Sequence, residues 1–248
     1  MSVAETGQRT LYDTFVGPTL DSALWQPLVL PTPDGTPWVF AEPGADIRVE
    51  AGSVVVSVPR FTRSHNELQS PDNAKHFLIS TSSVATPTSG QITFSVEMAA
   101  EKIRGAANDY RDGFATFNVF DMESGMVFDL VSTGTRILAI YERLPVAGVS
   151  EEDAFTYVVD APLAGVPTTP GTFHQYAITI DAQTGVVRFV VDGTLVYSIP
   201  SIPVMPRQLN LGMGLMTLSP ISAGSTTSIH GQGMIAQWRR FEYGPGGA

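Results

Sequence analysis

Hydrophobic and polar residues alternate with a period of two along most of the chain. In the segment QITFSVEM at 91–98, the four apolar side chains share one face and the polar side chains share the other. This alternation is typical of a β-strand with one buried face and one solvated face. Comparable runs end at Gly, Pro, Asp or Asn and predict roughly twelve strands, over 47–58, 76–81, 91–98, 114–121, 126–132, 136–143, 154–159, 173–180, 186–191, 194–199, 209–218 and 233–241.

Turn residues join these runs into antiparallel hairpins. Asp192-Gly193 is the dipeptide that two-residue turns with positive φ prefer, and Thr184-Gly185 and Ser124-Gly125 serve in the same way. Because no helical pattern of ten residues or more occurs, we predict an all-β fold of two antiparallel sheets packed face to face. A closed barrel is the competing arrangement. We expect one domain over 1–248, with frayed ends at about 1–9 and 244–248.

The composition narrows the possible partners. The 248 residues carry 14 Lys and Arg against 24 Asp and Glu, and the formal charge of -10 opposes binding to nucleic acid. Cysteine is absent from the sequence, which excludes disulfides, thiolate catalysis and Cys-ligated metals. We find neither a secretory signal nor an apolar stretch of about 18 residues, and we expect a cytoplasmic protein that does not enter a membrane.

Four segments, in chain order, resemble the concanavalin A-like lectin/glucanase superfamily. They are YDTFVGPTLDSALW, FHQYAITIDAQTGVVRFVVDGTLVYSIP, LNLGMGL and the closing QWRRFEYG. The resemblance covers most of the chain and implies a curved antiparallel jelly-roll sandwich. Laminarinase-like hydrolases of this superfamily carry an E-x-D-x-(x)-E strand, which is absent here; Phe120-Asp121-Met122-Glu123 is the nearest approach. The resemblance therefore implies an uncharacterised branch that has the fold without that catalytic motif.

Three carboxylates are the candidates for catalysis. A turn at 123–125 would place Asp121 opposite Val127, and the next hairpin would place Asp129 opposite Leu138. The predicted shared face then holds Asp121, Asp129, Glu142, Phe117, Val119, Val127 and Ile140. Like charges in apolar surroundings raise carboxyl pKa values, which suits general acid/base catalysis. A slip of one residue in the first hairpin would send the two aspartates to opposite faces.

The same residues also have structural interpretations. Asp121 is of a type that caps turns, and Glu142 is of a type that pairs with Arg. Tyr141 and Arg143 end a predicted strand, where they would orient a polar ligand. Alternatively, Arg143 pairs only with Glu142 or Glu151 on a solvated edge.

Other side chains are candidates for binding a substrate. Lys75 and His76 open a predicted strand, and His76 is either a pocket acid or base or a surface residue. Trp38 lies in a loop flanked by prolines, where it is free to stack on a sugar ring. Met213 and Phe117 either line an apolar cavity or belong to the core. The predicted substrate-binding residues are Trp38, Lys75, His76, Phe117, Asn118, Tyr141, Arg143 and Met213.

Motifs for cofactors are missing from the sequence. The four His residues lack metal-site spacing, and no P-loop, dinucleotide fingerprint or G-x-S-x-G elbow occurs, so we expect neither a metal nor a cofactor. We predict an enzyme that acts on a hydrophobic or polyoxygenated small molecule in the cleft of the concave sheet by general acid/base catalysis. The reaction type is left open between cyclisation, isomerisation and hydrolysis. A cyclase or isomerase would fit natural-product biosynthesis. The alternatives are a glycoside hydrolase or lectin-like glycan-binding module, and a small-molecule binding protein without catalysis.

Overall fold

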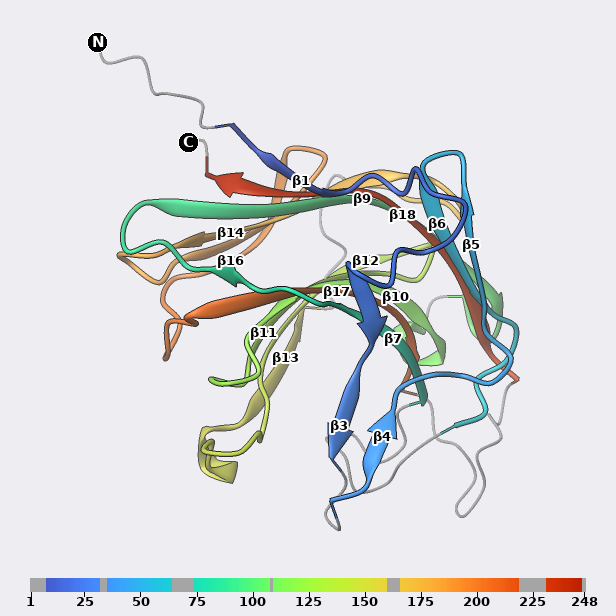
Figure 1. The fold of residues 1–248 in the computed structure, drawn as a ribbon, viewed down its shortest axis with the longest axis horizontal. Coiled ribbons are helices and arrows are strands. Elements are labelled where there is room, and N and C mark those ends of the chain that lie inside the picture. Colours follow the sequence, from blue (N-terminus) through green and yellow to red (C-terminus); the bar gives the residue numbers. More distant parts are fainter. Residues whose placement is uncertain are drawn as a thin grey trace.

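Two antiparallel sheets lie face to face in the computed structural model (Figure 1). The structure describes residues 8–31, 35–63, 74–107, 109–159, 166–218 and 231–246. The first sheet has the order β16 (Thr194–Ile199), β15 (Val187–Val191), β14 (His174–Asp181), β9 (Gln91–Arg104), β18 (Gly233–Pro245), β6 (Ser53–Val58) and β5 (Asp46–Glu50), with β1 (Thr10–Asp13) also paired to β18.

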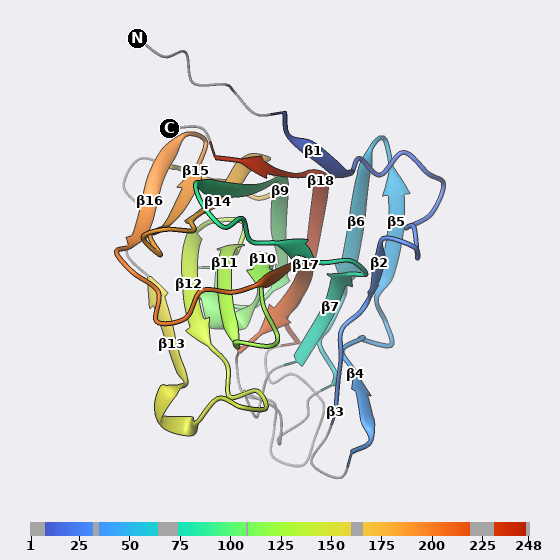
Figure 2. The same cartoon turned by 60° about the vertical axis from the view of Figure 1, so that its left-hand side comes forward.

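The second sheet carries the candidate site. Its order is β13 (Phe155–Val159), β12 (Ile137–Arg143), β11 (Met126–Ser132), β10 (Phe114–Phe120), β17 (Gln208–Thr217), β7 (Ala74–Ser80) and β2 (Trp25–Pro27), with β8 (Val84–Ala85) also paired to β17. A separate hairpin of β3 (Val29–Pro31) and β4 (Pro37–Val39) lies beside it. In Figures 1 and 2, β13 and this hairpin lie on opposite sides of the second sheet's lower part.

The main core fills the space between the sheets, as the alternation of apolar residues predicts. Phe128 and Leu130 of the second sheet and Phe94 and Trp238 of the first are fully buried in it. The Trp238 indole nitrogen donates a hydrogen bond to the Thr116 carbonyl (3.1 Å), which ties the two sheets together. The expected antiparallel sandwich is therefore confirmed, and the barrel alternative is wrong because two separate sheets form.

Several predicted boundaries differ from the structure. The predicted strand 47–58 is a hairpin of β5 and β6, because Ala51 and Gly52 both adopt positive φ (49° and 78°). The C-terminus is predicted to fray over 244–248, but the first three of these residues are held in place. Strand β18 reaches Pro245, and the Gly246 amide donates a hydrogen bond to the Gln91 carbonyl at 2.8 Å. Residues 1–7 and 247–248 lie outside the described residues.

Helical structure is limited to two short 3-10 turns in the part of the chain that the structure describes. These are η1 (Tyr110–Asp112) and η2 (Glu151–Asp153). No helix among the described residues has the length and apolar character needed to cross a membrane.

Candidate functional site

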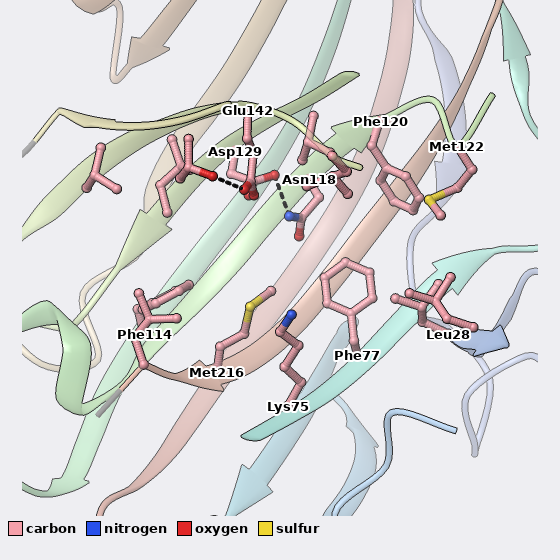
Figure 3. Close-up of a pocket in the computed structure, with 17 residues that line it drawn as sticks. Leu28, Lys75, Phe77, Phe114, Asn118, Phe120, Met122, Asp129, Glu142 and Met216 are labelled. Carbon is pink, nitrogen blue, oxygen red and sulfur yellow. Dashed lines mark hydrogen bonds between the residues drawn. The ribbon is translucent and has the colours of Figure 1, made fainter. Parts of the chain in front are cut away.

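A cavity of about 130 Å³ lies on the face of the second sheet that is turned away from the first; we call this the outer face. Its wall is mostly apolar and includes Leu28, Phe77, Phe120, Val127, Ile140 and Met216. Five polar side chains also line it: Lys75, Asn118, Asp129, Glu142 and Thr156 (Figure 3). A concave, largely apolar cavity with a few convergent polar groups is the usual form of a small-molecule site.

Strand register brings the two carboxylates to this face. Asn118 on β10 lies opposite Asp129 on β11, and Glu142 on β12 lies opposite Val127. Because Val127 and Asp129 are two residues apart on one strand, their side chains point to the same side of the sheet. Asp129 and Glu142 are thus diagonal neighbours, and such pairs lie roughly 7–8 Å apart, with their Cβ atoms somewhat closer.

Burial makes ionisation of Asp129 costly. The residue is 3% exposed, and its pKa is raised well above the usual range for Asp. Burial is the larger cause of this rise, and the negative charge of Glu142 is the second. The Asn118 side-chain amide donates a hydrogen bond to Asp129 Oδ1, and this bond, together with Lys75, partly offsets the rise. Like-charged groups in one site titrate as a unit, so one carboxyl of the pair keeps its proton at higher pH than an isolated Asp would.

Glu142 is held at the rim of the same cluster. The Thr156 hydroxyl donates to Glu142 Oε2 at 3.0 Å, and this contact comes from β13 at the edge of the sheet. Burial raises the pKa of Glu142, while the Thr156 hydrogen bond and the Lys75 charge lower it. Each carboxylate of the pair therefore has a hydrogen-bond partner on a neighbouring strand, Asn118 for Asp129 and Thr156 for Glu142.

Lys75 approaches the cluster from the other side of the cavity. It lies on β7, two strands away from β10, and its side chain points towards Asn118 and Asp129 (Figure 3). Burial lowers the pKa of the Lys75 ammonium group, and the charges of Glu142 and Asp129 oppose this change. The Lys75 Nζ lies 5.4 Å from the centroid of the Phe40 ring.

Two glycines on β17 make room for the cavity floor. A Cβ on Gly212 would lie 2.6 Å from Cζ of Phe77, and one on Gly214 would lie 2.6 Å from Cδ2 of the same ring. The Phe77 ring therefore rests on the bare backbone of β17, between Lys75 and the apolar wall. Any larger residue at these positions would push the ring into the cavity.

The predicted place of Asp121 is wrong. The predicted pairing of Asp121 with Val127 is off by one residue, because Phe120 is the residue that lies opposite Val127. Asp121 instead caps the turn: its carboxylate accepts from the Glu123 amide (2.9 Å), the Ser124 hydroxyl (2.8 Å) and the Arg207 amide (3.3 Å). Asp121 and Asp129 consequently face opposite sides of the sheet.

The second hairpin is also shifted, with a different outcome. Asp129 lies opposite Ile140 rather than Leu138, a shift of two residues. Because side chains alternate with a period of two, this shift leaves Glu142 and Ile140 on the predicted face. Of the predicted apolar neighbours, Val127 and Ile140 line the cavity, whereas Phe117 and Val119 point into the core between the sheets.

Three predicted binding residues are core residues. Phe117, Tyr141 and Met213 are buried between the sheets rather than in the cavity. The Tyr141 ring stacks on Phe128 (centroids 5.9 Å apart) and meets Phe155 edge-on at 4.8 Å. Their positions follow from the alternation, since each has the opposite parity to the cavity residues on its strand.

Trp38, His76 and Arg143 lie outside the cavity lining. Trp38 packs against Arg63, whose guanidinium carbon is 4.3 Å from the ring centroid. His76 is buried on the opposite side of β7 from Lys75, where its Nδ1 accepts from the Glu42 amide at 3.2 Å. Arg143 pairs with Asp153 at 3.7 Å, which corrects the predicted alternative of Glu142 or Glu151.

Sequence reasoning missed Thr156, Phe77 and the two glycines. Thr156 contacts Glu142 only because β13 pairs with β12, and the sequence marked 154–159 as a strand without indicating its neighbour. The Gly-x-Gly spacing of Gly212 and Gly214 was a usable signal, since alternate glycines in a strand mark a close approach of another group. No group of His, Asp and Glu able to hold a metal ion occurs among the described residues.

Comparisons with known proteins identify the fold of this chain but do not identify its activity. A family model with the description "Family of unknown function (DUF6081)" matches residues 12–243. A search of curated proteins gave no match. The chain is similar in structure to the endo-1,3-beta-glucanase (laminarinase) catalytic domain of Thermotoga petrophila, with TM-score 0.58, 13% identity, and coverage of 98% of this chain and 100% of that one.

Two further solved structures give the same picture. The endo-1,3-beta-glucanase of Streptomyces sioyaensis matches with TM-score 0.60, 12% identity and 99% coverage of both chains. The carbohydrate recognition domain of Emp47p matches with TM-score 0.53, 12% identity and 100% coverage of both chains. At these identities the similarity shows a shared sandwich fold and carries no activity over to this chain.

Proposed function

The chain belongs to the DUF6081 family, whose function is unknown, and we propose from its site that it binds a small, largely apolar molecule in the outer-face cavity and transfers a proton to or from it. Asp129 is the proposed general acid/base, and Glu142 sets its proton affinity. The observation that carries the proposal is the meeting of Asp129, Glu142 and Lys75 in one apolar cavity.

The hydrogen bond from Asn118 defines how Asp129 would act. Asn118 donates to Asp129 Oδ1, so this oxygen is occupied as an acceptor. The proton of the neutral carboxyl group then belongs on Oδ2, where it is available to a ligand oxygen. A carboxyl whose pKa is raised well above the usual range for Asp is suited to donate a proton and take it back in one reaction cycle.

The cavity also limits the ligand. Its volume of about 130 Å³ is close to the ~150 Å³ apolar cavities that bind benzene-sized molecules. The apolar wall favours a hydrocarbon body, and the polar cluster requires at least one oxygen on it. Proton transfer at such an oxygen supports cyclisation, isomerisation or hydrolysis, and these are the reaction classes to be tested.

A second candidate is cleavage of a glycosidic bond. Its support is the pair of carboxylates on one sheet face, within a fold shared with endo-1,3-beta-glucanases. The two-carboxylate mechanism of glycosidases needs such a pair. The apolar wall weighs against a sugar polymer, and Trp38, the predicted stacking residue, does not line the cavity.

One experiment separates the two candidates. The wild-type protein and Asp129→Asn would be incubated with a panel of small oxygenated hydrocarbons and, separately, with β-1,3-glucan, and products would be detected by mass spectrometry. We expect products from the small-molecule panel, with a loss of about 10²–10⁴ in rate for Asp129→Asn. Asp46→Asn is the matched control, because Asp46 is exposed and pairs only with Arg48 in the described structure.

Release of glucose oligomers that depends on Asp129 would favour the second candidate instead. Binding without any turnover, unaffected by Asp129→Asn, would leave a non-catalytic binding protein.

A further inference from the structure

We infer that Lys75 is an amine nucleophile that forms an imine with a carbonyl group of the bound ligand. The inference rests on the proposed function, because the step needs a proton donor in the same cavity. It names the substrate class as aldehydes or ketones with an apolar body.

The choice of lysine at this position is the first observation. The chain has 14 basic residues, of which 12 are Arg and only Lys75 and Lys102 are Lys. Arg stays protonated in proteins, whereas a buried Lys loses its proton readily and then becomes a nucleophile. Among the described residues that line the cavity, Lys75 is the basic one. This position therefore carries the type of basic side chain that can act as a nucleophile.

The surroundings of the amine are the second observation. Lys75 lines the cavity beside Phe77 and Met216 and points towards the carboxylate side (Figure 3). It makes no hydrogen bond or ion pair with any residue that the structure describes, apart from the contact of its Nζ with the Phe40 ring. A ligand carbonyl in the cavity would therefore meet an amine that no hydrogen bond or ion pair to a described residue engages.

The electrostatics support a neutral amine. Burial lowers the pKa of Lys75, and the opposing charges are those of Glu142 and Asp129. Each proton that the carboxyl pair retains removes one of these opposing charges. A neutral amine beside a neutral carboxyl is the combination that imine formation requires.

The chemical step balances without a further reactant. The Lys75 nitrogen lone pair adds to the ligand carbonyl carbon, the C=O π electrons move to oxygen, and a proton passes from nitrogen to that oxygen to give a carbinolamine. The Asp129 carboxyl then protonates the hydroxyl, the C–O bond breaks, and water leaves as the C=N bond forms. The product is an iminium ion next to the Asp129 carboxylate, and hydrolysis returns every group to its starting state.

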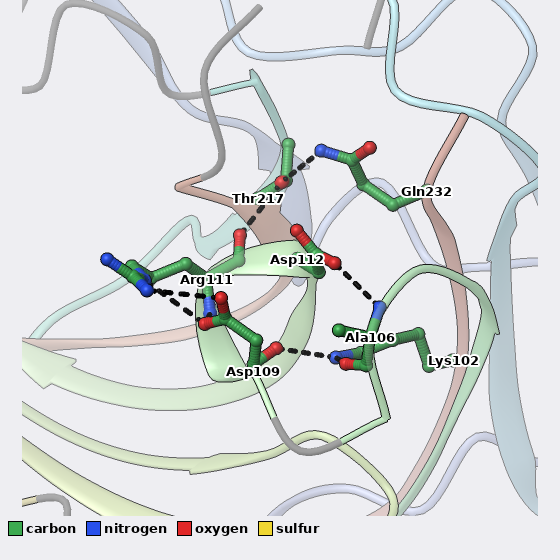
Figure 4. A network of polar contacts seen from close by, with 7 residues as sticks. All are labelled: Lys102, Ala106, Asp109, Arg111, Asp112, Thr217 and Gln232. Atoms are coloured by element: carbon green, nitrogen blue, oxygen red, sulfur yellow. Dashed lines mark hydrogen bonds and ion pairs between the residues drawn. The ribbon is translucent and has the colours of Figure 1, made fainter. Parts of the chain in front are cut away.

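Lys102 provides a matched internal control. Its Nζ donates to the Ala106 carbonyl (2.8 Å) and the Asp109 carbonyl (2.7 Å), within a polar network that includes Asp112 (Figure 4). Burial lowers the pKa of Lys102 as well. The two lysines therefore differ mainly in that the Lys102 amine is committed to backbone carbonyls and lies outside the cavity lining.

The competing role for Lys75 is that of a permanent cation that anchors a ligand carboxylate. Both roles place a ligand oxygen near Nζ, but only the nucleophile forms a covalent bond. A charge-preserving Lys75→Arg substitution would retain an anchor and abolish an imine.

The test uses the full chain with two carbonyl probes. Hexanal would form the imine, which sodium cyanoborohydride reduces to a stable hexyl amine, and 2,4-pentanedione would form an enaminone that absorbs in the near ultraviolet without a reductant. Peptide mapping then assigns the adduct to Lys75, Lys102 or the α-amino group. We expect labelling of Lys75 at pH 7 at least about tenfold faster than that of Lys102, because the Lys102 amine must first leave its backbone carbonyls, at a cost comparable to a tenfold rate factor. Lys102→Arg should label as the wild type does, and Lys75→Arg should lose the fast adduct while keeping its melting temperature.

Equal labelling of the two lysines, or no adduct at Lys75, would overturn the inference. Since the wild-type comparison needs no variant, a misfolded Lys75→Arg would not obscure this result. If Lys75 stays unlabelled while turnover depends on Asp129, the proposed function stands and the imine does not. If Lys75 is labelled and Asp129→Asn labels at the same rate, the amine is nucleophilic and the proposed role of Asp129 is wrong.

Discussion

Asn118 and Asp129 lie directly opposite each other on β10 and β11, and the Asn118 amide donates a hydrogen bond to the Asp129 carboxyl. This pair fixes the orientation of the carboxyl group at the centre of the outer face. It also makes an Asn at position 129 tolerable, because an amide there can still accept the same hydrogen bond. A substitution that removes the charge and keeps the contact is therefore available.

Asp129→Asn should change how stability depends on pH. The folded-state pKa of Asp129 is raised, so the folded wild type binds more protons than the unfolded chain above pH ~4. The contribution of Asp129 to the wild-type free energy of unfolding consequently falls as the pH rises from about 4 towards the raised pKa. The variant lacks this contribution. Its free energy of unfolding, measured with urea, should therefore rise relative to that of the wild type between pH 4 and pH 8. A difference that shrinks with rising pH would contradict the raised pKa.

His76→Asn should show the opposite trend. Burial lowers the pKa of His76 to about 4, so the unfolded chain binds more protons than the folded one between pH ~4 and ~6.5. The contribution of His76 to wild-type stability should therefore rise with pH in this window, by at most about 3 kcal/mol. Asn can accept the Glu42 amide hydrogen bond in place of Nδ1 but does not titrate.

Thermal unfolding of both proteins at pH 4.5 and pH 7 measures this difference. Glu42 is also buried, and its raised pKa acts with the opposite sign. Because Glu42 is present in both proteins, the comparison isolates His76. An equal pH dependence in the two proteins would show that His76 titrates normally.

Much of the fold followed from local patterns in the sequence. The alternation at 91–98 and the turn at Asp192-Gly193 each report a physical preference of a few neighbouring residues, and β9 and the β15–β16 hairpin form where these patterns predict. Side-chain parity along a single strand was equally predictable.

Register across strands was not predictable in the same way. The first hairpin has a four-residue loop closed by Asp121 and Met126, in which the Gly125 amide donates to the Asp121 carbonyl. The same sequence is also compatible with a three-residue loop, and this difference of one residue decides which face of the sheet Asp121 occupies. The approach of Lys75 to Asp129 was further out of reach, because it depends on the pairing of β17 with both β10 and β7, which are far apart in the sequence.

Gly212→Ala should damage the cavity floor. The new Cβ would meet Cζ of Phe77 at 2.6 Å and Cε1 at 2.9 Å, so the ring must move into the cavity. We expect a loss of about 1–3 kcal/mol in the free energy of unfolding, the usual cost of overpacking. Gly44→Ala is the control, since its Cβ would meet no atom within 4 Å.

The Phe77 ring should account for this loss. In a double-mutant cycle, Gly212→Ala should cost much less in a Phe77→Ala background, because the clashing atoms are gone. Additive losses in urea unfolding would place the clash elsewhere, with the Asn118 Cβ at 3.1 Å as the next contact.

Asp121→Ala separates the turn from the site. Asp121 is 4% exposed, and its carboxylate accepts from two backbone amides and a hydroxyl. Truncation leaves the Glu123 and Arg207 amides without this acceptor, which should lower the free energy of unfolding by about 1–3 kcal/mol. The hairpin from β10 to β11 keeps its ladder, so Asn118 still faces Asp129 across it. The folded variant should therefore label Lys75 with hexanal at the wild-type rate while its melting temperature falls. A variant of unchanged stability that loses this labelling would return Asp121 to the site and contradict the register described above.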